Sequence, residues 1–156
     1  MEAFEQLWPI SDVPSKYISI YDGPDVFLED YARVSIEHRL IFAAYWFQGE
    51  FLNGGLGQFF ENSTGVLAPE AVDACEALGM PRLASKLQEA MSWFGNPYPR
   101  MRGVRQKMLK AAARSGQDPF ERLDEEVGRL IYEEGSGLEA AALAFIRRDV
   151  EGADAP

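Results

Sequence analysis

The longest hydrophobic stretch of this chain predicts its central helix. Every residue from Leu40 to Phe47 is apolar or aromatic, so a helix here is hydrophobic all round, as is typical of a helix in the middle of a domain. Asn53, Gly54 and Gly55 follow, and these residue types tolerate the left-handed backbone that ends a helix. A second helical run, Gln58 to Asn62, comes next, so the pattern predicts two helical pieces that meet at a tight glycine corner. The residues that we expect to be most deeply buried are Leu40, Ala43, Ala44 and Phe47.

Apolar residues at helical spacing predict further helices on both sides of this stretch. Their approximate bounds are 24–33, 69–78, 81–94, 100–114, 119–131 and 136–146. Four of them begin at a proline, which is favoured at the first helical position. We therefore expect an all-α fold: a single compact multi-helix domain around the central hydrophobic helix.

The domain organisation follows from length and pattern. A chain of 156 residues suits one domain with a real core. Residues 1–24 lack a clear helical repeat, and we expect them to form an N-terminal arm packed on the body. Residues 25–150 form the predicted helical domain, and 151–156 are expected to be a frayed tail.

Composition excludes several classes of protein. Hydrophobic residues make up 47% of the chain, and no apolar run approaches the roughly 18 residues of a membrane span. The first residues are acidic where a secretory signal is basic and then apolar. Cys75 is the only cysteine, so an intramolecular disulfide is excluded. We expect a cytoplasmic protein that does not bind membranes.

The charge is strongly acidic and unevenly distributed. A net charge of −10 and a pI near 4.6 argue against direct binding to nucleic acid or to an anionic membrane. The chain up to Pro81 carries all of the net negative charge, and a wholly basic segment is followed by an acidic one at 118–134. The basic residues are Arg100, Arg102, Arg105, Lys107, Lys110 and Arg114. Either this segment neutralises an acidic neighbour inside the fold, or the segregation serves binding.

Candidate catalytic chemistry is sparse. His38 is the only histidine, and no nucleophile, base and orienting group can be assembled around it from the sequence. Zinc, P-loop and dinucleotide patterns do not occur. We therefore predict a protein that is not an enzyme and that uses no metal and no cofactor. The polar residues at the glycine corner are Asn53, Gln58 and Asn62, which suit either helix capping or a small-ligand site beside Gly54 and Gly55.

The stretch around the corner also carries a resemblance to a known family. The residues concerned read GEFLNGGLGQFFENSTG at 49–65, APEA at 68–71 and ALG at 77–79. This run resembles the signature of the bacterial family called domain of unknown function 4375. A characterised member of that family is a DNA mimic, an acidic dimer that occupies the DNA-binding surface of a transcription factor. The resemblance implies an acidic protein-binding module whose partner is a basic DNA-binding protein, and it implies a homodimer.

Carboxylates one helical turn apart can imitate a row of phosphates, because helix neighbours at this spacing lie about 5 to 6 Å apart. We place the partner-binding surface on acidic residues of two predicted helices: Asp25, Glu29, Asp30, Glu121, Asp124 and Glu125. Two alternatives stay open. One is an enzyme or small-ligand-binding protein that uses the Asn53 to Asn62 corner, and the other is a structural oligomer whose charge secures solubility.

Overall fold

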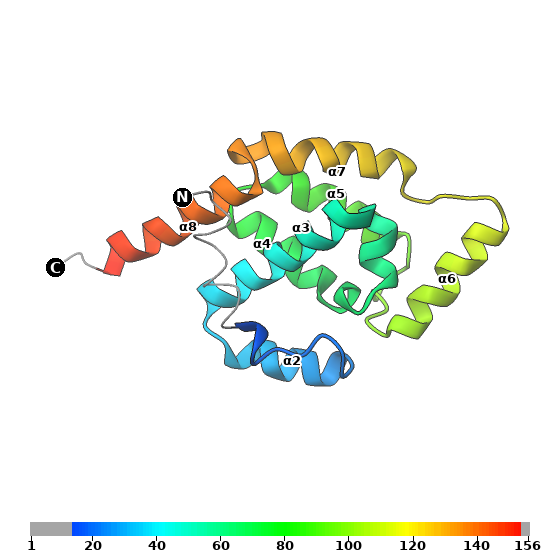
Figure 1. Cartoon of the computed structure of the whole chain (residues 1–156), viewed down its shortest axis with the longest axis horizontal. Helices are drawn as coiled ribbons and strands as arrows, with labels where there is room; N and C mark the ends of the chain where they lie inside the picture. The colour runs from blue at the N-terminus through cyan, green and yellow to red at the C-terminus, as the bar shows by residue number, and fades with distance from the viewer. Residues whose placement is uncertain (1–13, 154–156) are drawn as a thin grey trace.

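The computed structural model describes residues 14–153, and this part of the chain is helical with turns and contains no strand (Figure 1). The predicted all-α class is therefore confirmed. The helices are α2 (Pro24–Arg33), α3 (Ile36–Glu61), α4 (Ala68–Ala77), α5 (Pro81–Ser92), α6 (Arg102–Arg114), α7 (Glu121–Glu133) and α8 (Leu138–Ala153), with short 3-10 helices η1 (Ser63–Leu67) and η2 (Glu134–Ser136).

Helix α3 occupies the centre of the molecule. It contacts α4, α6, α7 and α8, while α5 packs against both α4 and α7. In Figure 1, α7 runs along the top of the body and α2 along the bottom, with α3 between them. Helices α8 and α6 extend from the left and right ends of the body. The other helices thus surround α3, as its hydrophobic pattern predicts.

Three of the four residues predicted to be deeply buried in the central helix are buried in the structure. Ala43, Ala44 and Phe47 are fully buried. The prediction that Leu40 is deeply buried is wrong, because its side chain is only half-buried. Leu40 lies one turn from Ile36, which is exposed, so it shares the less covered side of the helix at its start.

The glycine corner is where the sequence places it. Gly54 and Gly55 interrupt the helical backbone of α3, and Gly55 has a φ of 73°, in the left-handed region that favours glycine. The helix resumes at Leu56 rather than at Gln58 and ends at Glu61. The second limb is packed by aromatic rings: the ring of Phe60 lies 4.9 to 5.2 Å, centroid to centroid, from those of its neighbours. These neighbours are Phe59, Phe94 and Phe120.

The chain before α2 packs on the body as far as it is described. Ile18 and Ile20 are buried in the common hydrophobic core, and the Ser19 amide donates a hydrogen bond to Asp30 in α2 at 3.1 Å. The rest of the predicted arm, residues 1–13, lies outside the described residues. The domain boundaries at residues 24 and 150 stay predictions.

Several helix ends differ by a few residues from the predicted bounds: α5 ends at Ser92, α6 begins at Arg102, and α8 begins at Leu138. Helix α7 begins at Glu121 instead of Pro119, because the Asp118 carboxylate accepts a hydrogen bond from the Phe120 amide at 3.0 Å and holds this stretch in a turn. Helix α8 continues to Ala153, past the predicted start of the tail at Glu151. Residues 154–156 lie outside the described residues.

Candidate functional site

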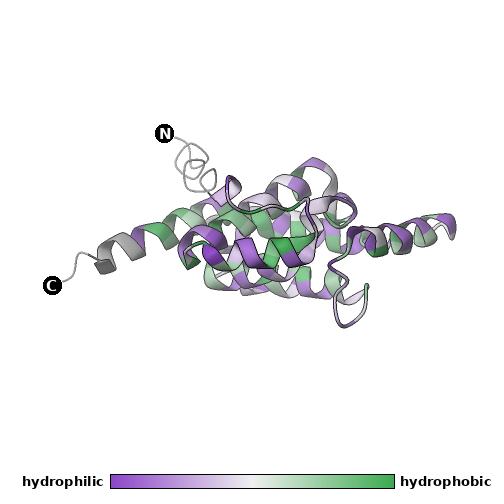
Figure 2. Ribbon diagram, turned by 90° about the horizontal axis from the view of Figure 1, so that it is seen from below, coloured by the Kyte–Doolittle hydropathy of each residue, from purple (hydrophilic) through white to green (hydrophobic). Residues whose placement is uncertain are grey.

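The six predicted partner-binding carboxylates do not form one surface. Three belong to α2 and three to α7, and these helices lie on opposite sides of α3 (Figure 1). The view from below places α2 on the side of the body that faces the viewer (Figure 2). The protein therefore presents two separate acidic surfaces, and each has to be judged by itself.

The surface on α7 contains an unneutralised pair. Glu121 and Glu125 are both exposed, one helical turn apart, and neither makes an ion pair with any residue that the structure describes. A rigid helix thus holds two like charges at a fixed spacing, although such a pair is mildly destabilising in an isolated helix. This arrangement leaves both carboxylates available to a cation from outside the molecule.

Asp124 has a different role from its neighbours on α7. Its side chain is half-buried, and its carboxylate accepts a hydrogen bond from the backbone N–H of Leu56 at 2.8 Å. Loss of solvation raises the pKa of Asp124, the hydrogen bond from Leu56 lowers it, and the charge of Asp118 raises it further. Asp124 therefore serves the fold by capping the second limb of α3.

The remaining acids of α7 are neutralised by nearby cations. Glu126 forms ion pairs with Lys86 at 2.6 Å and with Arg122. Arg122 also pairs with Glu89 of α5, and Glu133 pairs with Arg129 at 3.2 Å within α7. These contacts tie α5 to α7 and cancel charge locally. Glu121 and Glu125 are thus the strongest candidates on this surface.

The surface on α2 has fewer free charges than its sequence indicates. Asp25 is exposed and makes no ion pair with a described residue. Glu29 pairs with Arg33 one turn later, and Asp30 is half-buried and accepts the hydrogen bond from Ser19. Only Asp25 is left as a free carboxylate among the three predicted residues of this helix.

Helix α4 adds carboxylates that sequence reasoning missed. Asp73 and Glu76 are exposed, whereas Glu70 is buried and receives two hydrogen bonds from Arg100 at 2.8 and 2.9 Å. Loss of solvation and the charges of Glu70 and Glu76 raise the pKa of Asp73. The three acids are spaced i, i+3 and i+6 on a predicted helix, and this spacing was the signal that could have found them.

Hydrogen bonds to Glu50 stabilise the glycine corner, and sequence reasoning did not single out this residue. Its carboxylate accepts hydrogen bonds from the Gln58 amide at 2.8 Å, from the Asn62 amide at 3.0 Å and from the Thr64 hydroxyl at 2.8 Å. Asn53 is exposed at the surface of the corner. Gln58 and Asn62, two of the three polar side chains proposed for a small ligand, therefore hold the two limbs of α3 together through Glu50.

Among residues 14–153, the basic segment forms an ion pair with an acidic neighbour at one position only. Arg100 pairs with Glu70, as described above. Arg105 is completely buried and donates hydrogen bonds to the carbonyls of Phe60 at 2.8 Å, Asn62 at 3.0 Å, Pro99 at 3.1 Å and Arg100. Burial lowers the pKa of the Arg105 guanidinium, and Tyr98 raises it. Arg105 thus joins α6 to the end of α3.

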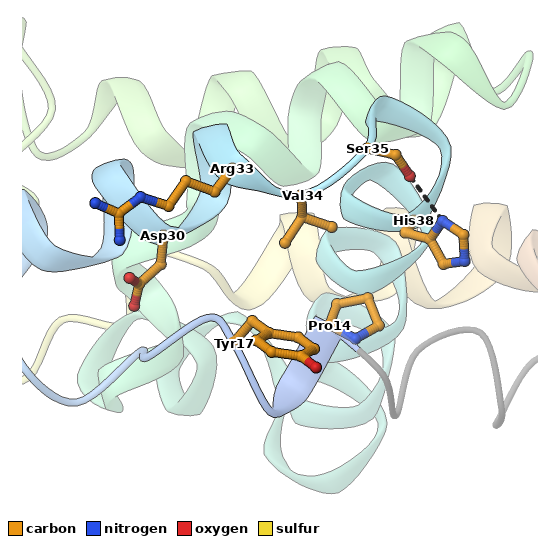
Figure 3. Close-up of a pocket in the computed structure, with 7 residues that line it drawn as sticks. All are labelled: Pro14, Tyr17, Asp30, Arg33, Val34, Ser35 and His38. Carbon is orange, nitrogen blue, oxygen red and sulfur yellow. Dashed lines mark hydrogen bonds between the residues drawn. The ribbon is translucent and has the colours of Figure 1, made fainter.

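The lone histidine lies at the rim of a cavity of about 420 Å³ (Figure 3). The residues that line it are Pro14, Tyr17, Asp30, Arg33, Val34, Ser35 and His38. His38 Nδ1 and the Ser35 hydroxyl are hydrogen-bonded at 2.7 Å, while Asp30 lies at the other end of the cavity (Figure 3). Ser35 is the N-cap residue of α3, but its side chain makes no capping hydrogen bond to the helix backbone, so this contact joins two side chains three positions apart. Among residues 14–153, no carboxylate is hydrogen-bonded to His38 in the place of the third, orienting group of a catalytic triad.

Three further properties bear on function. Within residues 14–153 no group of three or more His, Cys, Asp or Glu side chains is placed to hold a metal ion. No helix in this part of the chain is long and apolar enough to cross a membrane. Cys75 is buried, and burial raises the pKa of its thiol to about 12, which makes it a poor nucleophile at neutral pH.

These features define an acidic all-α protein whose exposed carboxylates lie on separate helices. The sequence model described as DMP19-like protein matches residues 32–149, which is more than half of the chain, so the chain belongs to this family. Searches of the curated proteins and of the solved structures found no match. Membership of the family called domain of unknown function 4375 stays a prediction.

Proposed function

We propose that this protein is a non-enzymatic protein-binding module that acts as a DNA mimic. The observation that carries the proposal is the exposed, unneutralised pair Glu121 and Glu125, held one turn apart on α7. Membership of the DMP19-like family supports it, because the sequence resemblance implies DNA mimicry. The partner is a protein whose DNA-binding surface is basic.

The physical basis is charge complementarity at a fixed spacing. Two carboxylates about 5 to 6 Å apart on a rigid helix can accept charge-assisted hydrogen bonds from Arg and Lys side chains that otherwise contact neighbouring phosphates. The net charge of −10 steers a basic partner towards the protein over longer distances. No bond is made or broken in such a complex, so no catalytic group is needed.

The small-ligand alternative has little support from the contacts at the corner. Gln58 and Asn62 both donate to Glu50, and a side chain on Gly55 would come within 3.0 Å of the Asp124 carboxylate. These groups are engaged with one another across the corner. We therefore assign the corner to the stability of the fold and the acidic helices to binding.

The test begins with the partner. The protein is immobilised and exposed at low salt to an extract of its native cell, and the proteins that elute at high salt are identified by mass spectrometry. The purified partner is then titrated against wild type, Glu121→Gln/Glu125→Gln and Asp25→Asn/Glu29→Gln. Both variants remove two negative charges, so they are matched controls for net charge. Asp124 is left intact because the fold uses it.

We expect the α7 variant to bind at least tenfold more weakly, because each lost charge-assisted contact is worth about 1 to 3 kcal/mol. Wild-type binding should fall steeply with salt, and duplex DNA should compete for the partner. Loss of affinity in the α2 variant alone would move the mimic surface to α2. Binding that ignores salt, DNA and both variants would exclude DNA mimicry.

A further inference from the structure

Two large apolar side chains are exposed at one hollow, where α3, α7 and α8 meet. Tyr132 near the end of α7 is 65% exposed, and Leu52 in the first limb of α3 is 47% exposed. Both line a surface hollow of about 190 Å³, together with Gln48 and the first turn of α8. In Figure 1 this region is at the left end of α7, where the chain turns into α8. Single exposed apolar residues are ordinary, but two that share a hollow indicate a contact surface.

Tyr132 belongs to the same side of α7 as the unneutralised acidic pair. Glu121, Glu125 and Tyr132 are spaced i, i+4 and i+11, which aligns them along a helix of about 3.6 residues per turn. Tyr132 follows Glu125 by a rise of about 10 Å along the helix axis. Gly128 lies between them and adds no side chain to this side of the helix. A partner that lies along α7 therefore meets two carboxylates and then an aromatic ring.

The size and the rim of the hollow suit a side chain of such a partner. Sites for small molecules usually have volumes of about 300 to 1,000 Å³, so a hollow of about 190 Å³ fits one side chain better. Glu139 of α8 lies at its rim, where the carboxylate accepts a hydrogen bond from the Gln48 amide at 3.2 Å. The hollow thus combines an apolar wall with the acidic character of the neighbouring surface.

We propose that the partner-binding surface of α7 includes an apolar part, formed by Leu52 and Tyr132, which receives an apolar side chain of the same basic partner. This inference rests on the function proposed above and adds shape to charge. The carboxylates steer a basic protein and are screened by salt, whereas a buried aromatic ring supplies affinity that salt does not screen. Cations are common to all DNA-binding surfaces, but an apolar side chain about 10 Å from them is not, so the apolar part gives specificity.

Charge favours this occupant over a second copy of the chain. The hollow is continuous with the side of α7 that carries Glu121 and Glu125, and it has Glu139 at its rim, so a basic surface is complementary to all of it. A second copy has a net charge of −10 and is repelled at long range.

The first test uses two synthetic helical peptides as probes of the full-length protein. One peptide has two Arg residues one turn apart and a Leu two turns away on either side, so its spacing matches Glu121, Glu125 and Tyr132 in both directions. The other peptide has Ser in place of each Leu and the same charge. Fluorescence anisotropy at low salt should show the Leu peptide binding wild type at least tenfold more tightly than the Ser peptide.

Variants of the protein assign this preference to the hollow. Leu52→Ser/Tyr132→Ser should abolish it. Tyr21→Ser/Leu28→Ser is the matched control, because it replaces the same two residue types at exposed positions in and just before α2, on the opposite side of α3 (Figure 1). This control should keep the preference. Thermal melts check that both variants are folded.

The charge variant separates this inference from the proposed function. Glu121→Gln/Glu125→Gln should weaken both peptides and leave the preference for Leu in place, and added salt should do the same. Equal binding of the two peptides to wild type, with both weakened in the charge variant, would overturn the apolar part and leave the acidic surface standing. A charge variant that binds both peptides like wild type would instead remove the support for DNA mimicry, while a retained preference for Leu would keep the apolar part.

The second test identifies what enters the hollow in the cell. The photo-reactive residue p-benzoylphenylalanine replaces Tyr132 in the full chain, and the cross-linked segment is sequenced by mass spectrometry. We expect an apolar residue of another protein with Arg or Lys close to it in a DNA-binding surface. Cross-links to a second copy of this chain, or to a segment without basic residues, would overturn the proposal.

Discussion

The carboxylate of Asp124 accepts a hydrogen bond from the backbone N–H of Leu56 at 2.8 Å, across 68 positions of sequence. Leu56 is the first residue of the second limb of α3, directly after the left-handed Gly55. Asp124 therefore caps the N-terminus of this limb in the way that an N-cap residue caps an ordinary helix, although Asp124 belongs to another helix. It fixes the direction in which the chain leaves the glycine corner.

The first prediction concerns this cap. Asp124→Ala removes the acceptor and should lower the free energy of unfolding by about 1 to 2 kcal/mol, the usual cost of losing an N-cap. Asp124→Asn keeps an amide oxygen and should lose less. Urea denaturation measures both variants. Glu125→Ala is the control on the same helix, since an exposed residue without partners should change stability by no more than about 0.5 kcal/mol. Equal losses at the two positions would contradict the capping role.

The second prediction concerns Arg105. Its guanidinium is completely buried and satisfies four backbone carbonyls at the junction of α3 and α6. Arg105→Ala should cost about 3 to 5 kcal/mol, because it opens a cavity and leaves buried acceptors without donors. Arg105→Lys should also destabilise, since an ammonium group cannot reproduce the planar fork of donors. Denaturant melts should show that Lys107→Ala, an exposed change on the same helix, has little effect.

The third prediction concerns Glu50. Glu50→Gln replaces one carboxylate oxygen by an amide nitrogen, which then faces a donor from Gln58, Asn62 or Thr64. The free energy of unfolding should fall by about 1 to 3 kcal/mol, because at least one of these partly buried donors loses its acceptor. Glu61→Gln provides the comparison, as Glu61 is exposed and its carboxylate has no hydrogen bond among the described residues. A Glu50→Gln protein as stable as Glu61→Gln would show that the three hydrogen bonds are dispensable.

The fourth prediction concerns pH. Loss of solvation and the neighbouring acids Glu70 and Glu76 raise the pKa of Asp73 in the folded protein. A raised pKa means that folding disfavours the ionised carboxylate. The folded protein therefore loses stability as Asp73 ionises, that is, as the pH rises through the pKa of Asp73 in the folded state. Asp73→Asn should therefore be more stable than wild type at pH 7. The advantage should disappear as the pH falls towards the ordinary Asp value of about 3.9.

Thermal melts of wild type and Asp73→Asn across this pH range provide the measurement for the fourth prediction. The difference between the two proteins should follow the titration of a single carboxyl group. A difference that is constant with pH would mean that the substitution acts through packing or helix propensity instead of through charge. Asp25→Asn, on an exposed position of α2, controls for the loss of one negative charge.

The sequence predicted best what depends on neighbouring residues. The hydrophobic run in α3 and the break at Gly54 and Gly55 are local patterns, and the structure contains both. The first residue of a helix, in contrast, depends on whether the preceding residues form a turn or a helical turn, and these two conformations differ little in free energy. Asp118 shifted that balance, so α7 begins at Glu121 and not at Pro119.

The candidate site was predictable only in part. Sequence identifies which helices are acidic, because charge and helical spacing are both local. It could not show that α2 and α7 lie on opposite sides of α3, nor that Glu126 meets Lys86 of α5 while Glu121 and Glu125 meet no cation among residues 14–153. The placement of helices decides which charges meet, and this placement depends on the packing of the whole core.

Sequence by itself determined that this protein is acidic, helical and organised around one hydrophobic helix with a glycine corner. Only the tertiary structure decided which polar residues serve the fold. Asp124 and Arg105 resemble ordinary surface charges in the sequence, but each makes at least one hydrogen bond to backbone more than 40 positions away. The reason is physical: a buried backbone group takes whichever side chain the packed helices bring within about 3 Å, and no local pattern records that distance.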